Sequence, residues 1–188
     1  MISAWHIVIS GFSQRLGQTT GCQRLWMDLG CLRSDTTVVE FRPWDSDWGD
    51  LAELVKIASD PLPMINVYAY SWGAGYGAIQ LARQLRRRQL VVDRAVFADP
   101  VYHAKTLVGR MCAHVLAYCP CWRITIPDNV LSVKSTIQRT SLLHGHRLRA
   151  ENPSRTKIHK PIRVVADHRW MDDSPEFCQL VMEAAGLE

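Results

Sequence analysis

Residues 66–80, NVYAYSWGAGYGAIQ, decide the fold of this chain. Residues 64–70 are apolar and rich in strand-forming side chains, and three glycines (Gly73, Gly75 and Gly77) follow at once. Residues 74–88 then carry apolar side chains at helical spacing, which predicts a helix. A glycine-rich connection from strand to helix serves either to hold phosphate groups or to expose a nucleophile, which here is Ser71.

The rest of the chain repeats this alternation of strand and helix. Strands are predicted over residues 5–10, 37–41, 64–70, 94–98, 130–137 and 162–166. Helices are predicted over residues 20–29, 51–58 and 74–88, and a last one begins at Ser174-Pro175. Strands separated by helices need crossover connections, so we expect an α/β fold with a mostly parallel sheet and helices on both faces. Functional groups gather beyond the carboxyl ends of such strands, where the sequence places Gly11, Ser71, Asp99 and His168.

The composition predicts one globular domain over residues 1–188. Hydrophobic residues make up 47% of the chain and charged residues 21%, which argues against disorder. The net charge of +4 is modest, and the basic residues gather in 83–88 and 147–163. We interpret these as a solvated helix end and a solvated loop, because no nucleic-acid-binding motif accompanies them.

Six cysteines are present, and none of them forms a CxxC pair. They are Cys22, Cys31, Cys112, Cys119, Cys121 and Cys178. A site of His144, His146, His159 and an aspartate would match no zinc-ligand spacing, so we expect no metal. The N-terminal sequence MISAWHIVISGF lacks a basic start and is too short to span a membrane. We therefore expect a cytoplasmic protein with mostly reduced, buried thiols.

Nucleotide binding fits neither glycine-rich segment. In residues 73–77 the third glycine comes one position too early for the dinucleotide motif G-x-G-x-x-G. Residues 11–20, GFSQRLGQTT, resemble a P-loop only superficially, because Gln18 stands where a lysine should contact the phosphates. The sequence therefore favours the interpretation in which the turn presents Ser71.

Residues 69–73, AYSWG, resemble the nucleophile elbow G-x-S-x-G of the α/β-hydrolase family, with Ala69 in place of the first glycine. The elbow needs small residues on both sides of the serine, because its backbone is strained and neighbouring chain segments pass close by. Alanine meets that steric demand nearly as well as glycine.

The resemblance implies a catalytic triad in the chain order serine, acid, histidine. Ser71, Asp99 and His168 satisfy that order, each after a predicted strand. Two alternatives stay open: Asp99 could instead cap the next helix, and Asp167 could supply the acid. His103 is the second candidate for the base, because it lies near Asp99 in the sequence.

The resemblance also implies an oxyanion hole, in which amide groups stabilise the tetrahedral intermediate. Trp72, directly after the nucleophile, would donate one N–H. Residues 9–12, ISGF, resemble the family's H-G-x segment with serine in place of histidine, which makes Phe12 the second donor.

The chain is short for the family, which implies a cutinase-like or phage-lipase-like serine esterase without a large cap. Residues 102–126 are apolar and could form a lid, an acyl-binding wall or a core helix. We expect a small-molecule or lipid-like ester as substrate, no cofactor, and no nucleic-acid partner. The alternatives are a thioesterase or peptidase on the same triad, or a non-catalytic binding module, in which Ser71 and His168 would lie far beyond about 3 Å.

Overall fold

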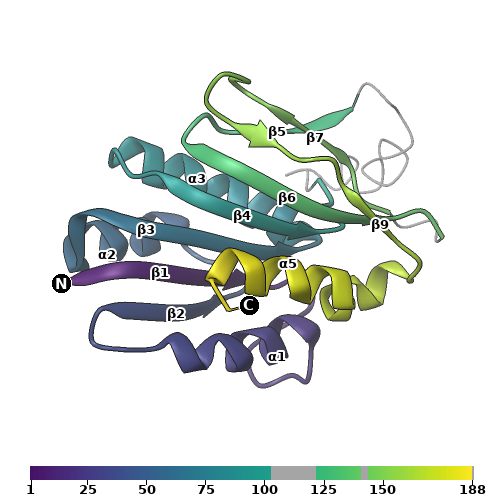
Figure 1. The fold of residues 1–188 in the computed structure, drawn as a ribbon, viewed down its shortest axis with the longest axis horizontal. Helices are drawn as coiled ribbons and strands as arrows, with labels where there is room; N and C mark the ends of the chain where they lie inside the picture. Colours follow the sequence, from purple (N-terminus) through teal and green to yellow (C-terminus); the bar gives the residue numbers. More distant parts are fainter. Residues whose placement is uncertain (103–121, 141–143, 188) are drawn as a thin grey trace.

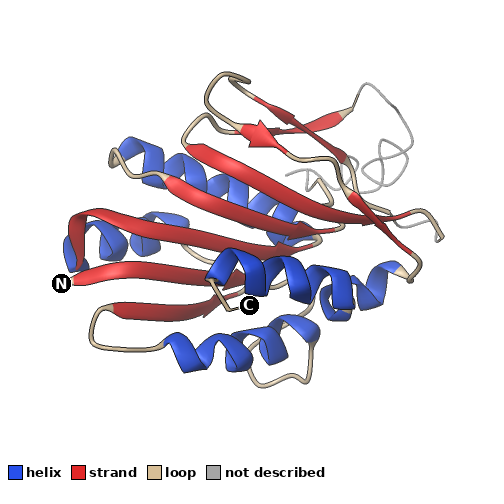
Figure 2. Ribbon diagram, in the orientation of Figure 1, coloured by secondary structure: helices blue, strands red, loops and turns tan. Residues whose placement is uncertain are grey.

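A seven-stranded parallel sheet forms the centre of the molecule (Figures 1 and 2). The computed structural model describes residues 1–102, 122–140 and 144–187. The strands of this sheet are β1 (Ile2–Ile9), β2 (Thr37–Arg42), β3 (Ser59–Tyr70), β4 (Val92–Ala98), β6 (Val130–Gln138), β8 (Lys157–Ile158) and β9 (Ile162–Val164). They run in the order β2-β1-β3-β4-β6, and both β8 and β9 pair with β6. A separate parallel pair is formed by β5 (Arg123–Ile126) and β7 (Arg147–Ala150).

Helices cover both faces of the main sheet, as Figure 1 shows. They are α1 (Gly21–Asp28), α2 (Trp48–Ala58), α3 (Ala78–Arg87) and α5 (Pro175–Ala185). Helices α2 and α3 share one apolar core with the sheet, and α1 and α5 share a second core on its other face. The predicted α/β class, with a mostly parallel sheet in one small domain, is confirmed.

Strand β1 illustrates why the sheet is buried on both sides. Ile7 and Ile9 point into the core beneath α2 and α3, while Val8 points into the core beneath α1 and α5. All three side chains are fully buried. A parallel strand with apolar residues at consecutive positions is stable only when both faces of its sheet are covered, which the crossover helices do here.

The helix ends follow the local sequence signals. Ser174 caps α5 by accepting a hydrogen bond from the amide of Phe177, and Pro175 occupies the first helical position, as predicted. The helix ends at Gly186, whose φ of +79° lies in the left-handed region that glycine adopts without strain. Thr20 caps α1 in the same way through the amide of Gln23.

The structure corrects the prediction that residues 147–163 form a loop. They contain β7 and β8, and β9 begins at Ile162. Strands β7 and β8 were missed because cationic side chains alternate with apolar ones over only two to four residues, a pattern weaker than that of a core strand. Of residues 102–126, the stretch 103–121 lies outside the described residues, so the expectation of a lid or acyl wall stays untested; the end of the segment forms β5.

The helix predicted over residues 74–88 begins differently from the prediction. Gly73–Gly77 form one π-helical turn, and regular α-helix starts only at Ala78. An alanine Cβ at Gly75 would lie 1.9 Å from the Val101 carbonyl oxygen, so glycine is required for this approach. Such π-helical turns are often found beside functional sites.

No helix in the described parts of the chain is both long and apolar enough to cross a membrane. Three of the cysteines lie in these parts and carry free thiols. Cys22 is buried, as expected, and Cys178 is half-buried. Cys31 is exposed, which corrects the expectation for that residue.

Candidate active site

Ser71 lies on a sharp turn directly after β3. Its φ of +53° places the backbone in the left-handed region, which a non-glycine residue adopts only at a cost of about 1–2 kcal/mol. Hydrogen bonds hold the turn: the Ser71 amide donates to the Ala98 carbonyl, and the Ser71 carbonyl accepts from the amides of Gly75 and Val101. The strained conformation is therefore maintained by the start of the next helix and by the segment after β4.

Small residues allow neighbouring segments to pass close to this turn. A Cβ at Gly73 would lie 2.4 Å from the Ser10 carbonyl oxygen, and a Cβ at Gly11 would lie 2.7 Å from the Tyr70 ring. Gly11 also lies beside the Cβ of Ser71. Gly73, the small residue two positions after the serine in the predicted elbow, is therefore required for steric reasons. The contacts of Gly11 show that the loop after β1 reaches the serine.

The three residues predicted as a triad meet in the structure. The Ser71 hydroxyl lies 2.9 Å from Nε2 of His168, and Nδ1 of His168 lies 2.7 Å from Oδ2 of Asp99. With the ring proton on Nδ1, His168 donates to Asp99 and accepts the Ser71 proton at Nε2. All three side chains are buried, although Ser71 and His168 keep 5% and 8% of their surface exposed. These distances match those required of a nucleophile, its base and an orienting acid.

Asp99 is held by several donors besides His168. Its Oδ1 accepts hydrogen bonds from the amides of Gly145 (2.8 Å) and Gln138 (3.3 Å), and its Oδ2 also accepts from the Gln138 side chain (3.1 Å). The Gln138 side-chain oxygen in turn accepts from the amide of Thr140. A buried carboxylate is tolerated only when it is hydrogen-bonded in this way, and these donors fix the orientation of the Asp99 side chain.

Tyr70 fixes the other side of His168. Its hydroxyl donates to the His168 carbonyl oxygen at 2.7 Å, and the two rings lie 5.3 Å apart. Burial raises the pKa of the Tyr70 hydroxyl above its ordinary value, so that the group remains a proton donor at neutral pH. The segment that carries His168 is thereby tied to the end of β3.

The loop after β1, which carries Phe12, is fastened to the segment after His168. Gln14 accepts a hydrogen bond from the Gly11 amide and donates to Oδ2 of Asp172. The same carboxylate oxygen accepts from the amide of Cys22. Burial raises the pKa of Asp172. Gln14 therefore joins the start of this loop to the short helix His168–Asp173.

Phe12 and Trp72, the two residues predicted to form the oxyanion hole, pack against each other. Their ring centroids are 4.3 Å apart, and Trp44 extends the contact with a centroid 4.9 Å from that of Trp72. Tyr76 in turn contacts Trp44 at 6.1 Å. Phe12 is 58% exposed. The structure thus places an accessible aromatic cluster (Phe12, Trp44, Trp72 and Tyr76) beside Ser71, while donation by the two backbone amides stays a prediction.

Sequence reasoning missed Gln138, Gly145 and Tyr70 as supports of the triad. The sequence shows that the strand ending at Gln138 offers no acid, and the structure places an amide there that donates to the acid of the neighbouring strand. A side chain at Gly145 would collide with Asp99, its Cβ falling 2.6 Å from Oδ1. Such contacts join residues 39 to 98 positions apart, for which no local pattern exists.

The other candidates lie elsewhere. Asp167 caps the short helix His168–Asp173 by accepting from the Arg169 amide, whereas the carboxylate hydrogen-bonded to Nδ1 of His168 is that of Asp99. His103 falls outside the described residues. In the described residues, no group of three or more His, Cys, Asp or Glu side chains could hold a metal ion.

Comparisons with known proteins add a distant structural likeness. No family model matches the chain, and no curated protein matches it. Among solved structures, the chain is similar to YbtT, a type II thioesterase from the yersiniabactin NRPS/PKS biosynthetic pathway, with 11% identity and a TM-score of 0.45. That alignment covers 97% of this chain and 92% of the other, and a serine-to-alanine variant of YbtT matches with the same identity and TM-score.

Proposed function

We propose that this protein is a serine hydrolase that cleaves a carboxylic ester through an acyl-enzyme intermediate. One observation carries the proposal: the continuous hydrogen-bonded chain from the Ser71 hydroxyl through His168 to Asp99, with separations of 2.9 and 2.7 Å. A non-catalytic binding module has no need for a strained serine in contact with an oriented imidazole. The short Ser71–His168 distance therefore supports the enzyme over the binding module.

In the proposed reaction, Oγ of Ser71 attacks the carbonyl carbon of the ester as Nε2 of His168 takes the hydroxyl proton. Asp99 keeps the imidazole in the correct tautomer and stabilises its positive charge. The amides of Phe12 and Trp72 bind the negative oxygen of the tetrahedral intermediate. His168 then gives the proton to the leaving alcohol, and a water molecule, activated by the same histidine, releases the acid from Ser71.

The aromatic cluster supports an apolar acyl group in the substrate. Phe12 is largely exposed beside the serine, and Trp44, Trp72 and Tyr76 are half-buried. Burying an apolar chain against such rings stabilises the complex by about 25 cal/mol per Å² of surface removed from water. The preferred substrate is therefore an ester with a medium-length or aromatic acyl group.

A panel of p-nitrophenyl esters of graded acyl length, with matched thioesters and anilides, tests the proposal. We expect ester turnover that falls by several orders of magnitude in Ser71→Ala, with the fold unchanged by circular dichroism. Phe12→Ala retains its backbone amide, so it should raise KM for the longer esters and leave acetyl ester turnover nearly unchanged. Ester turnover that survives Ser71→Ala would refute the proposal. Faster cleavage of the thioesters than of the esters would leave Ser71 as the nucleophile and make the protein a thioesterase instead of an esterase.

A further inference from the structure

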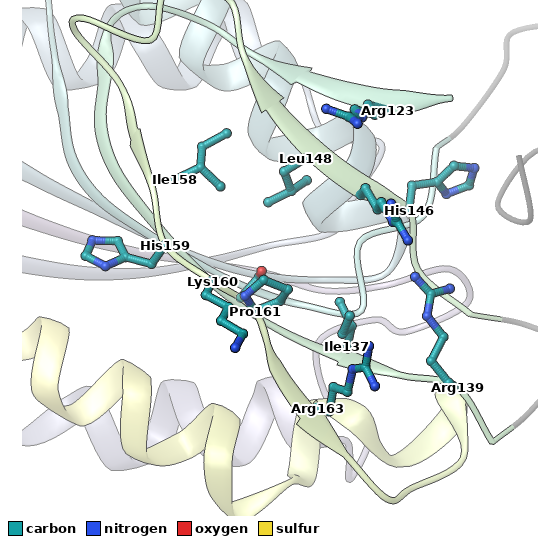
Figure 3. A pocket seen from close by; sticks show the side chains of 12 residues that line it. Arg123, Ile137, Arg139, His146, Leu148, Ile158, His159, Lys160, Pro161 and Arg163 are labelled. Atoms are coloured by element: carbon teal, nitrogen blue, oxygen red, sulfur yellow. The ribbon is translucent and has the colours of Figure 1, made fainter. Parts of the chain in front are cut away.

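A second concave site lies away from the triad. A pocket of about 370 Å³ is enclosed between the β5–β7 pair and the β6, β8 and β9 end of the main sheet (Figure 3). Ser135 and Ile137 of β6 line it. Side chains alternate along a strand, so Gln138, which reaches Asp99, points to the opposite face of β6. The pocket is therefore separate from the site proposed for hydrolysis.

Cationic side chains dominate the rim of the pocket. Five of the lining residues are permanently charged at neutral pH and exposed: Arg123, Arg139, Arg147, Lys160 and Arg163. They come from β5, the end of β6, β7, the connection after β8, and β9. Among the described residues that line the pocket, none is an aspartate or glutamate. Five like charges that converge from separate strands repel one another unless an anion lies between them.

Most of the described arginines outside the pocket are ion-paired, and those that line the pocket are not. Seven arginines outside the pocket form an ion pair with a carboxylate: Arg15, Arg24, Arg42, Arg86, Arg88, Arg155 and Arg169. Within the part of the chain that the structure describes, none of the four pocket arginines forms such a pair. Arg139 instead contacts His144 at 2.6 Å, which restrains its guanidinium group at the rim. The pocket thus gathers four arginines without an ion-pair partner among the described residues around one hollow.

Apolar side chains form part of the pocket lining. They are Ile137, Leu148, Ile158 and Pro161, and Ser135 and His146 add polar groups to the same lining. In Figure 3, Leu148 and Ile158 lie side by side, to the left of Arg123 and of the pair Arg139 and Arg163. His159 points away from these side chains in the figure, and its ring contacts Ser132 at 3.1 Å. Cationic and apolar side chains that line the same pocket match a ligand with an anionic head and an apolar body.

We propose that this pocket binds a small organic phosphate. The guanidinium group presents paired N–H donors in a planar fork that matches phosphate oxygens, and four of the five rim cations are arginines. The volume falls within the range of small-molecule sites, roughly 300–1,000 Å³. The phosphate lies among the arginines, and the organic body contacts Ile137, Leu148 and Ile158. The proposal stands independently of the hydrolase activity.

Calorimetric titration with phenyl phosphate, inorganic phosphate and phenol tests the site. We expect saturable binding of one phenyl phosphate per chain, at least tenfold tighter than inorganic phosphate because the ring is buried, and no detectable binding of phenol. The double variant Arg139→Gln/Arg163→Gln should weaken phenyl phosphate binding at least tenfold. The control Arg83→Gln/Arg149→Gln removes the same charge outside the pocket, from exposed arginines without an ion pair in the described part of the chain, and should change affinity less than twofold.

Three results would overturn the proposal. Binding that does not saturate, or an equal loss in both double variants, would mean attraction of anions by net charge alone. Equal affinity for phenyl phosphate and inorganic phosphate would exclude the role given to the apolar side chains of the lining. Both double variants replace exposed side chains, so each should keep the melting temperature of the wild type, which is measured alongside.

Discussion

Asp99 combines a buried charge with a strained backbone. Its side chain is fully buried and its φ is +40°, so the chain holds an anion in a conformation that non-glycine residues rarely adopt. Donors from His168, Gln138 and Gly145 surround the carboxylate. This arrangement fixes the direction in which Asp99 accepts from His168 and therefore the direction in which His168 faces Ser71.

Gln138 acts as a positioning residue through Asp99. Gln138→Leu removes the side-chain donor at 3.1 Å from Oδ2 of Asp99 and leaves the backbone donor in place. A hydrogen bond to a charged group contributes about 1.5 kcal/mol or more, and a loss of that size in orienting the triad lowers kcat about tenfold. KM should stay unchanged, because Gln138 does not touch the substrate. Steady-state kinetics beside the exposed control Gln179→Leu check this, and a rise in KM at constant kcat would contradict it.

The connection between β3 and α3 depends on close approach between backbone segments. Gly75 lies against the carbonyl of Val101, and Gly73 lies against the carbonyl of Ser10. The π-helical turn Gly73–Gly77 thus brings the segment after β4 and the loop after β1 to Ser71 from two sides. Close contacts between backbone segments therefore position the elements around the serine.

Gly75→Ala should destabilise the fold. The added methyl group would lie 1.9 Å from a backbone oxygen, so the turn or the Val101 segment must move, at a cost of about 1–3 kcal/mol. Ester turnover should fall as well, since Val101 donates to the Ser71 carbonyl. Gly30→Ala is the matched control, because its methyl group would meet only the end of the Arg33 side chain at 3.5 Å. Urea unfolding of both variants measures the difference, and equal stability would contradict the steric argument.

The pairing of β1 with β3 contains a buried histidine that makes the fold sensitive to acid. Nδ1 of His6 is hydrogen-bonded to the Tyr68 hydroxyl. Burial of the imidazole lowers the pKa of His6 from 6.5 to about 4. Between pH 4 and pH 6.5, His6 is therefore protonated to a greater extent in the unfolded chain than in the folded one. The contribution of neutral His6 to stability is present above pH 6.5 and is lost as the pH falls towards 4.

His6→Gln should remove this dependence. A pKa difference of this size corresponds to roughly 3 kcal/mol, so the free energy of unfolding of the wild type should fall relative to the variant by that order between pH 7 and pH 4. Denaturant unfolding at several pH values measures both curves. Parallel curves for the two proteins would show that His6 does not titrate on unfolding in this range.

At the scale of the whole molecule, local patterns were sufficient to predict the layered fold and the three residues that meet at its edge. Ser71 has small flanking residues, Asp99 precedes a proline at a strand end, and His168 stands between a strand and a capped helix. Parallel strands end at one edge of the sheet, so three local signals become one site. The β3–β4 register, which pairs Tyr70 with Ala98, brings Ser71 beside Asp99.

Features that depend on contacts between distant segments could not be predicted. The β5–β7 pair consists of short strands with alternating cations, and its partner choice follows from tertiary packing. The same holds for the pocket, whose rim joins Arg123 to Arg163 across 40 positions of sequence. Of the basic residues that resemble a solvated loop in the sequence, the fold collects Arg147, Lys160 and Arg163 around one hollow.

The central claim is that Ser71 is a nucleophile activated by His168. Intact-protein mass spectrometry after incubation with a fluorophosphonate probe tests it most directly, with peptide mapping of the adduct. We predict one adduct per chain, located on Ser71, absent from Ser71→Ala and formed far more slowly in His168→Ala. A folded wild-type protein that remains unlabelled, or a label on any other residue, would contradict the claim.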